Sequence, residues 1–448
     1  MGNALSSFSV YVRAMKLSRQ ATEWFLCYVS IHYLFSSFLV WEPVHSVLRL
    51  RFVYGLFLSF LPSILLATIL TGGTFSWTGR YARALKSTVG RWSGHSSGSL
   101  RILVSEAWLK DGLFSVYIYF ASLSLLLTKV ALIDNPSSYD ELNHLAITKA
   151  VADSGFNAIG QIFSALPYPP LFYVAMSALL NPFGLTLLTG RIASSIISSF
   201  APVIVYHSAR LIVRSRPFAL AATVGYILSS LFQILAFRYT LDGMTTLWLT
   251  CSFLFFLKAM RESSVRYSIL CSIFFLLCAL TYYPPAIWLA IGFLAAYFYA
   301  LRKETTRYVF LPLLVALLSF IIALTCFTGQ WSLVLRFILF GERIHSEYFP
   351  TFVFDLVIIF GWSPYLAFIF GLKSLARSDE DEILVLGVVL IFSAFSTSLM
   401  GMLIRRAVSV YPIFLIYALA YLARGRSRVA FVLVWLNSFW WGLLNLIA

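Results

Sequence analysis

The chain has 448 residues, of which 60% are hydrophobic and 11% are charged, and its mean hydropathy is +0.85. This composition excludes an ordinary soluble domain, which is about 25% charged. The formal net charge is +15, yet the positive residues fall in short loops between apolar runs, where Lys and Arg mark the cytoplasmic side of a membrane protein. The charge therefore indicates topology and contact with membrane lipids, and no nucleic-acid partner is expected.

Apolar runs of about 20 residues recur along the whole chain, and each is long enough to cross a bilayer. The runs are continuous and not alternating, which excludes a β-barrel. We predict an all-α polytopic membrane protein with about 13 transmembrane helices. The expected spans are 24–41, 52–70, 113–132, 185–205, 218–237, 244–257, 267–280, 287–301, 309–327, 352–372, 383–399, 408–422 and 429–447.

The loops between these spans predict a cytoplasmic amino terminus, because the largest basic clusters then share the cytoplasmic face. Residues 1–111 form a two-span extension with a basic cytoplasmic loop, and 112–448 form the main transmembrane domain. The plasma membrane is the expected location. The five cysteines lie mostly in apolar runs without a C-x-x-C pair, so we expect neither disulfides nor a metal site from them.

The segment 133–183 is the predicted extracytoplasmic active-site loop, and it holds four of the scarce carboxylates (Asp134, Asp140, Glu141 and Asp153). Ser138 and Glu141 form an S-x-x-E capping-box pattern, and Gly155 is the expected helix stop. An alternative is therefore that Glu141 only binds a backbone N–H at the start of this helix and has no catalytic role. A second helix, 168–180, is predicted to lie at the membrane interface because Pro182 ends it short of a full span.

Acidic and basic side chains pair in sequence at several of the outer turns. Arginines at membrane ends can bind a lipid-linked phosphate, and an acid beside that phosphate can act as a general base. Snorkelling or surface pairing is the simpler alternative. His144 follows Asp140 by one helical turn, but D-E-x-x-H is not the zinc-protease motif, and no metal site is expected.

The order of these motifs resembles the GT-C glycosyltransferases, closest in pattern to the protein O-mannosyltransferase and aminoarabinose transferase group. The resemblance rests on Asp140-Glu141, on P-P-L-F-Y and F-G-L-T-L-L-T-G-R after it, and on R-Y-T-L-D at 238–242. It continues through T-Y-Y-P-P at 281–285 and R-R-A-V-S-V-Y-P at 405–412, spanning residues 112–425.

The resemblance implies a transferase that moves a sugar from a polyprenyl- or dolichyl-phosphate donor to a protein, lipid or glycan acceptor outside the cytoplasm. It needs no cofactor, although an acidic pair can attract a divalent cation. By carry-over, Asp140 is the expected base and Glu141 its partner, and Asp242 is the second acid. Arg191 and Arg238 are expected to organise the carboxylates or the donor phosphate, and Arg343, Arg405 and Arg406 are further candidates for binding that phosphate. The expected substrate-pocket residues are His144, Tyr168, Tyr282 and Tyr411.

Two other functions remain open from the sequence. The first is a non-catalytic GT-C-like subunit of a membrane complex, in which Asp140 would be dispensable. The second is a transporter or flippase of lipid-linked substrates. Transporters usually carry ionisable groups near the membrane centre, and the predicted span centres here are nearly free of them, which argues against transport.

Overall fold

The structure is a computed structural model of the whole chain. The regions that it describes are residues 100–133, 139–155, 169–213, 215–282, 411–420 and 428–447, with scattered residues within 24–34 and 286–319. Every regular element in these regions is a helix. The predictions for 1–23, 35–99 and 320–410 lie outside the described residues.

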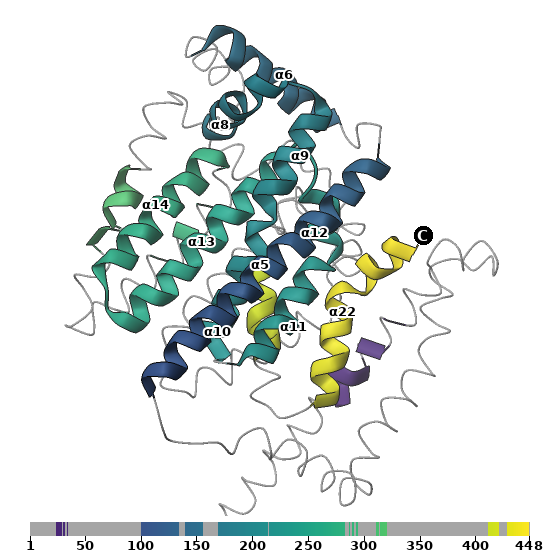
Figure 1. The fold of residues 1–448 in the computed structure, drawn as a ribbon, viewed down its shortest axis with the longest axis vertical. Coiled ribbons are helices and arrows are strands. Elements are labelled where there is room, and N and C mark those ends of the chain that lie inside the picture. The colour runs from purple at the N-terminus through teal and green to yellow at the C-terminus, as the bar shows by residue number, and fades with distance from the viewer. Residues whose placement is uncertain are drawn as a thin grey trace, which may run out of the picture.

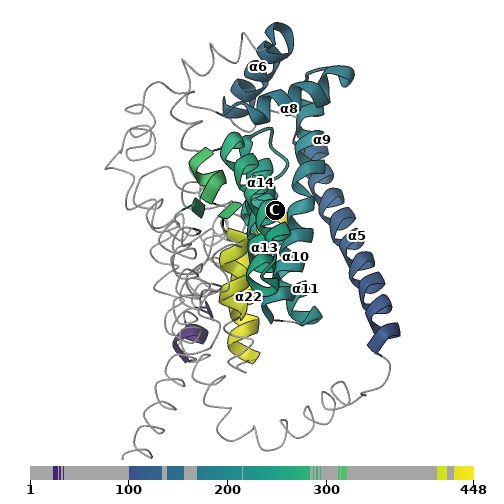
Figure 2. The same cartoon turned by 90° about the vertical axis from the view of Figure 1, so that its left-hand side faces the viewer.

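A helical bundle forms the body of the molecule, and two shorter helices cap one end of it (Figures 1 and 2). Within the described regions, three stretches are long and apolar enough to cross a membrane: 111–132, 187–213 and 241–262. They agree with the expected spans 113–132, 185–205 and 244–257. The chain is therefore a polytopic helical membrane protein, while the count of about 13 spans stays a prediction.

Helix α13 (Leu241–Glu262) is central and α5 (Leu100–Leu132) is peripheral. Of the apolar window in each helix, 72% is buried in α13 but only 22% in α5. The exposed face of α5 carries Leu113, Val116, Tyr117 and Phe120. Their i, i+3, i+4, i+7 spacing places them on one side of the helix, and in a membrane protein that side faces lipid.

The second candidate span consists of two consecutive helices, α9 (Leu187–Ser198) and α10 (Phe200–Val213). Thr186 and Thr189 form a capping box at the start of α9. In the low-dielectric interior, Ser195 and Ser199 donate to the carbonyls four residues before them, so these hydroxyls add no unpaired polar atoms.

The predicted span 218–237 is wrong as a single helix. The structure has α11 (Arg216–Ile227) and a six-residue helix α12 (Ser230–Leu235). Ser229 separates them because its Oγ donates to the Tyr226 carbonyl and accepts the Phe232 N–H. These local bonds compete with a continuous helix, a competition that the apolar pattern does not reveal.

The remaining helices follow the sequence expectations closely. Helix α14 (Val265–Thr281) covers the expected span 267–280, and α22 (Arg428–Ile447) covers 429–447. A helix at 411–420 lies within the expected span 408–422. Side chains of these helices join α5, α10, α11 and α13 in one large hydrophobic core.

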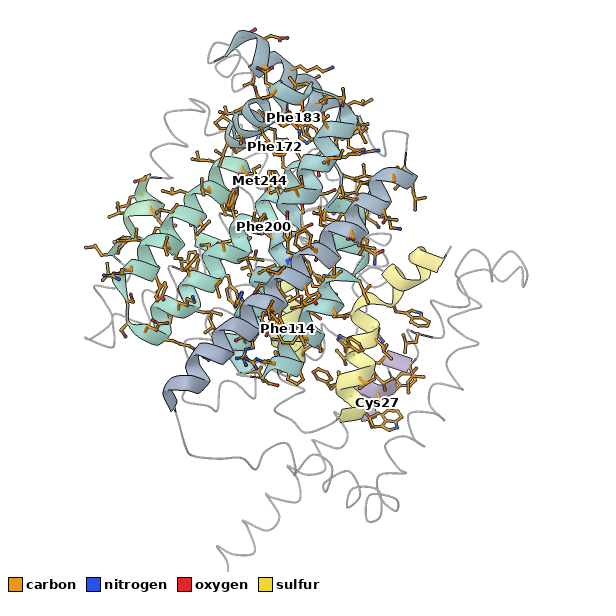
Figure 3. All side chains as sticks on the ribbon, viewed as in Figure 1. Cys27, Phe114, Phe172, Phe183, Phe200 and Met244 are labelled. Atoms are coloured by element: carbon orange, nitrogen blue, oxygen red, sulfur yellow. The ribbon has the colours of Figure 1, made fainter. Side chains whose placement is uncertain are left out.

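The cap consists of α6 (Tyr139–Ser154) and α8 (Leu171–Leu180), which lie together at the upper end in Figures 1 and 2. Helix α6 ends at Gly155, whose φ of 58° is the left-handed value predicted for a helix stop. Helix α8 has ten residues and passes into a short 3-10 turn, η1 (Asn181–Phe183), at Pro182, as expected for a helix too short to cross. A second hydrophobic cluster, which includes Phe172 and Met244, attaches this cap to α9 and α13 (Figure 3).

Candidate functional site

Glu141 lies in the first turn of α6 and is completely buried. Its two carboxylate oxygens accept hydrogen bonds from Arg191, from Nε at 3.0 Å and from Nη2 at 2.7 Å. The backbone N–H of Tyr239 donates to Oε1 at 3.0 Å. A buried carboxylate needs such compensation, because an unpaired charge in this environment would be very costly.

Arg191 sits in α9 and is only 2% exposed. Beyond the paired contact with Glu141, its Nη1 donates to the carbonyl of Ile133 at the end of α5. Its guanidinium also lies over the ring of Phe237, 5.8 Å from the centroid. One arginine therefore joins four segments, and we call Ile133, Glu141, Arg191, Phe237 and Tyr239 the Glu141 group.

Tyr239 connects this group to the rest of the cap. Its hydroxyl pairs with the Thr148 hydroxyl of α6 at 2.8 Å, and its ring packs on the backbone of Gly190. A Cβ at Gly190 would come within 2.5 Å of that ring, so the close approach requires glycine. Burial raises the pKa of the Tyr239 phenol well above its ordinary value, which keeps the hydroxyl protonated.

His144 faces the second cap helix, α8. Its Nδ1 lies 2.8 Å from the hydroxyl of Tyr173 in α8, and the imidazole is 5% exposed. Phe172 packs edge-on against the same imidazole. Tyr282, at the end of α14, packs against the hydrophobic cluster that contains Tyr173. The structure thus brings two of the predicted substrate-pocket residues to the end of the bundle that holds Glu141.

Asp140 directly precedes Glu141 and is only partly buried. Successive residues in a helix point about 100° apart, so the direction that buries Glu141 turns Asp140 toward a different side of α6. The Glu141 group fixes the backbone on which Asp140 stands. Asp140 is therefore a partly exposed residue in a helix turn that the Glu141 group holds in place.

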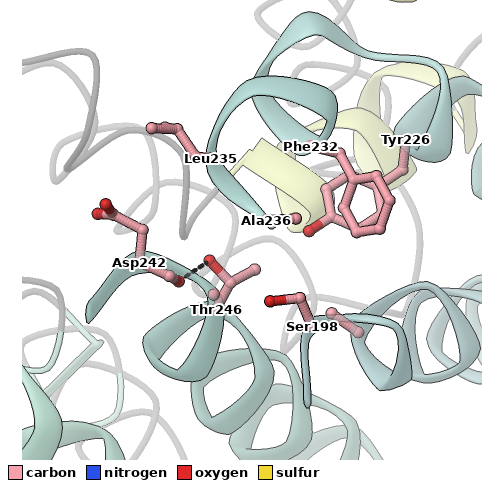
Figure 4. Close-up of a pocket in the computed structure, with 9 residues that line it drawn as sticks. Ser198, Tyr226, Phe232, Leu235, Ala236, Asp242 and Thr246 are labelled. Atoms are coloured by element: carbon pink, nitrogen blue, oxygen red, sulfur yellow. Dashed lines mark hydrogen bonds between the residues drawn. The ribbon is translucent and has the colours of Figure 1, made fainter. Parts of the chain in front are cut away.

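Asp242, the predicted second acid, lies in the first turn of α13 and is 5% exposed. Its carboxylate accepts a hydrogen bond from the Thr240 hydroxyl at 2.9 Å. Asp242 also borders a small cavity with Ser198, Gly243 and Thr246, and in Figure 4 its carboxylate is turned away from Ser198. The cavity is small, with room for about one water molecule.

The remaining predicted site residues lie in other parts of the chain. Arg238 is half-buried in the loop that also carries Tyr239. Tyr411 is 2% exposed and donates to the Ser438 carbonyl of α22, so the structure packs it within the helix bundle and does not open it to a substrate. Tyr168, Arg343, Arg405 and Arg406 lie outside the described residues.

Arg191 was predicted to organise the carboxylates or bind the donor phosphate. The structure directs Nε, Nη1 and Nη2 to protein oxygens, so in this conformation it organises Glu141. Glu141 in turn accepts hydrogen bonds from Arg191 of α9 and from the backbone N–H of Tyr239. Its carboxylate therefore binds groups outside α6. Among the described residues, no group of three or more His, Cys, Asp or Glu side chains is arranged to hold a metal ion.

Sequence reasoning did not find Tyr239, Thr148 or Tyr173. Tyr239 stands inside the R-Y-T-L-D motif between two charged residues that drew attention, and nothing in its spacing points to α6. The partners of these three residues are 29 to 98 positions away in the chain, so only the tertiary fold brings them together.

Comparisons with known proteins give structural matches only. No family model matches the chain, and no curated protein matches it. Two solved structures of ArnT from Cupriavidus metallidurans are similar in fold. The one bound to undecaprenyl phosphate has a TM-score of 0.45 and 16% identity over 70% of this chain, and the apo form has 0.44 and 17% over 71%.

This chain spans 60% of the length of each ArnT chain. ArnT is a GT-C aminoarabinose transferase, from the group whose motifs the sequence resembles. At this level of similarity the match transfers neither an activity nor any residue's role to the present chain.

Proposed function

We propose that this protein is an integral-membrane glycosyltransferase that uses a polyprenyl-phosphate-linked sugar, with Asp140 as its general base. The observation that carries the proposal is the adjacency of a partly exposed acid and a buried one. Glu141 and Arg191 fix the first turn of α6, and the adjacent Asp140 is left partly exposed at the same place. A catalytic carboxylate has to be held in this way, since misplacement by 1 Å can cost much of the rate.

The proposed reaction needs only the chemistry that this end of the bundle offers. Asp140 takes the proton from an acceptor hydroxyl or amine, whose oxygen or nitrogen attacks the anomeric carbon of the donor sugar. The bond from that carbon to the phosphate oxygen breaks, and the polyprenyl phosphate leaves with the electron pair. Arg238 is the described candidate for the leaving phosphate, and Arg343, Arg405 and Arg406 are further candidates.

In this proposal Glu141 and Arg191 are positioning residues and do not touch the substrate. The end of the bundle that carries the cap faces away from the cytoplasm, as the basic loops predict. Tyr173 and His144 pack against each other in the cap, and Tyr282 packs on the same hydrophobic cluster, so these side chains help to hold α6 and α8 in place.

The test is sugar transfer from radiolabelled polyprenyl-phosphate donors in membranes that contain the wild type or Asp140→Asn. Asparagine keeps the size of aspartate and can start a helix, but it cannot accept the proton. We expect the transfer rate to fall by about 10²- to 10⁴-fold, with the unfolding temperature unchanged. The matched control is Asp153→Asn, which removes an exposed carboxylate from the other end of α6 and should keep full activity.

One observation favours a second function, that of a non-catalytic subunit. The carboxylate of Glu141 is fully engaged in binding protein groups, which a scaffold would need as much as an enzyme. If Asp140→Asn is folded and as active as the wild type, Asp140 is not the base. If the wild type transfers no sugar from any donor, the scaffold function replaces the enzymatic one.

A further inference from the structure

The small cavity beside Asp242 lies within the helix bundle, at a point where several helices end or begin (Figure 4). Helices α9 and α12 end beside it, and α13 begins beside it. Ser198 lies well inside the candidate membrane span 187–213, so the cavity is at a depth where a polar group has no bulk water to bind. Five helices contribute to its walls, with Ser198, Ala201, Tyr226, Leu235 and Thr246.

The hydroxyl of Ser198 distinguishes this cavity from ordinary apolar packing. Ser198 is 2% exposed, and its Oγ has no hydrogen-bond partner among the residues that the structure describes. The nearby Ser195 and Ser199 instead donate to carbonyls four residues before them. A buried hydroxyl without a hydrogen bond costs free energy, so a polar molecule that fits the cavity would bind there favourably.

Gly243 brings the Ser198 hydroxyl against the start of α13. A Cβ at Gly243 would collide with Ser198 Oγ, and it would lie 3.6 Å from the carbonyl oxygen of Ala236. Because glycine has no side chain, the hydroxyl and the carbonyl both come close to the same point. Ser198 and Ala236 therefore place two polar groups on one side of the cavity.

Tyr226 supplies a second hydroxyl from α11. Its ring packs on Phe232, with the centroids 5.1 Å apart, and in Figure 4 its hydroxyl oxygen is directed toward Ala236. A phenolic hydroxyl can donate and accept. The cavity thus combines several polar groups with room for about one water molecule, and these are the two conditions for a buried water.

We propose that this cavity binds one water molecule, which the hydroxyls of Ser198 and Tyr226 hold between α9 and α11. The Ala236 carbonyl is a further acceptor for it. Buried waters in proteins typically make about three hydrogen bonds of this kind. This inference does not depend on the proposed transferase activity.

The location gives this water a structural role beside the predicted second acid. Asp242 borders the same cavity, and the Thr246 hydroxyl donates to the Asp242 carbonyl in the first turn of α13. The water therefore connects α9 and α11 at the start of the helix that carries Asp242.

The first test uses the sign of a stability change in the full chain, purified in detergent. Ser198→Ala removes a hydrogen bond to the water, and we expect the unfolding temperature to fall by about 1–3 °C. In a dry cavity the same substitution would remove a buried hydroxyl without a partner, and the unfolding temperature would stay the same or rise.

Ser208→Ala is the matched control for this sign. Ser208 is also buried, and its Oγ also has no hydrogen-bond partner among the described residues, but Ser208 does not line the cavity. Its replacement should not lower the unfolding temperature.

A double variant tests whether the two hydroxyls bind the same water. Tyr226→Phe alone should lower the unfolding temperature by an amount similar to Ser198→Ala. If one water joins the two hydroxyls, the loss in the double variant should be clearly smaller than the sum of the single losses. Additive losses would contradict a shared water.

Radiolytic footprinting detects the water directly in the wild type. Hydroxyl radicals that form from a bound water in an X-ray beam oxidise the side chains beside it, even buried ones. We expect several-fold more oxidation of Phe232, which lines the cavity, than of Phe253, which is equally buried but does not line it. The double variant should bring the oxidation of Phe232 down to that of Phe253.

The proposal is wrong if Phe232 of the wild type is oxidised no more than Phe253. It is also wrong if Ser198→Ala leaves the unfolding temperature unchanged or raises it, or if Ser208→Ala lowers it as much. If a variant fails to fold, the oxidation of the wild type still decides between a hydrated and a dry cavity.

Discussion

The two ends of the bundle use the same chemical groups in opposite environments. Each has one carboxylate, at least one arginine and a tyrosine, and each joins three or more segments of the chain. At the cap end Glu141 and Arg191 are 0% and 3% exposed by side chain, whereas at the other end Asp111 and Arg210 are 20% and 27% exposed. Burial makes the first pair a fixed part of the structure, whereas the second pair is partly exposed.

The largest expected difference comes from removing one arginine at each end. Arg191→Met removes the guanidinium that pairs with the buried Glu141 carboxylate, and we expect it to cost about 3–5 kcal/mol of unfolding free energy. Arg210→Met at the exposed end should cost less than about 1 kcal/mol. Thermal unfolding in detergent measures both. Equal losses at the two ends would show that burial does not distinguish the pairs.

A double variant sharpens this first prediction. Replacing both partners, as Glu141→Leu with Arg191→Met, removes the unpaired charge and should recover much of the stability lost in Arg191→Met. Transfer activity should stay low, because Asp140 loses its fixed position. Recovery of both stability and activity would contradict a positioning role for the pair.

The next effect concerns glycines at the two ends. Gly190→Ala places a Cβ against the Tyr239 ring, and since both hydrogen-bonding ends of Tyr239 are held, we expect a loss of about 1–3 kcal/mol. Gly112→Ala meets nothing within 4 Å and stands inside helix α5. That substitution should stabilise by about 0.5–1 kcal/mol. Denaturant or thermal unfolding tests the opposite signs.

A smaller effect is expected from Tyr239→Phe, which removes the hydroxyl pair with Thr148. Thr148 keeps its bond to the His144 carbonyl, so no buried donor is left without a partner and the cost should be about 1 kcal/mol. Tyr117→Phe on the exposed face of α5 is the control and should change stability very little. A loss of several kcal/mol in Tyr239→Phe would mean that the hydroxyl does more than join α6 to the loop.

The smallest effect is that of Asp111→Asn on stability, because its ion pairs with Arg210 and Arg216 are partly exposed. Half-exposed ion pairs contribute about 0–1 kcal/mol, and salt screens them. We expect a loss within that range that shrinks further at high ionic strength. Glu141→Gln should cost more and respond less to salt, because water and ions do not reach it. Unfolding at two salt concentrations measures the contrast, and an equal salt response at both ends would contradict it.

Some structural features follow directly from the sequence. Apolar run length placed the spans that became α13, α14 and α22 to within a few residues. Gly155 ended its helix as predicted, because a left-handed stop is a local property of glycine. The helix break at Ser229 was not predicted. The sequence of an apolar run does not show whether a serine hydroxyl in it will hydrogen-bond to the neighbouring backbone.

The candidate site could be predicted only in part from the sequence. The family resemblance raised the hypothesis that Arg191 organises the carboxylates or the donor phosphate, and the structure brings Arg191 to Glu141 across 50 positions. The structure also shows that Glu141 is buried and Asp140 is partly exposed, which the sequence of two adjacent acids does not indicate. The placement of Tyr411 inside the bundle depends likewise on contacts between helices distant in the chain.

By itself the sequence determined that the chain crosses a membrane as helices, where most of the described helices begin and end, and where charge gathers. These features follow from local composition. Each helix forms its backbone hydrogen bonds within its own segment, and each apolar run favours the bilayer over water without help from the others. The tertiary structure alone decided which charges are buried with partners and which stay exposed. Burial depends on what the other segments cover, and burial separates Glu141 from Asp140 and the Glu141 group from the partly exposed ion pairs of Asp111.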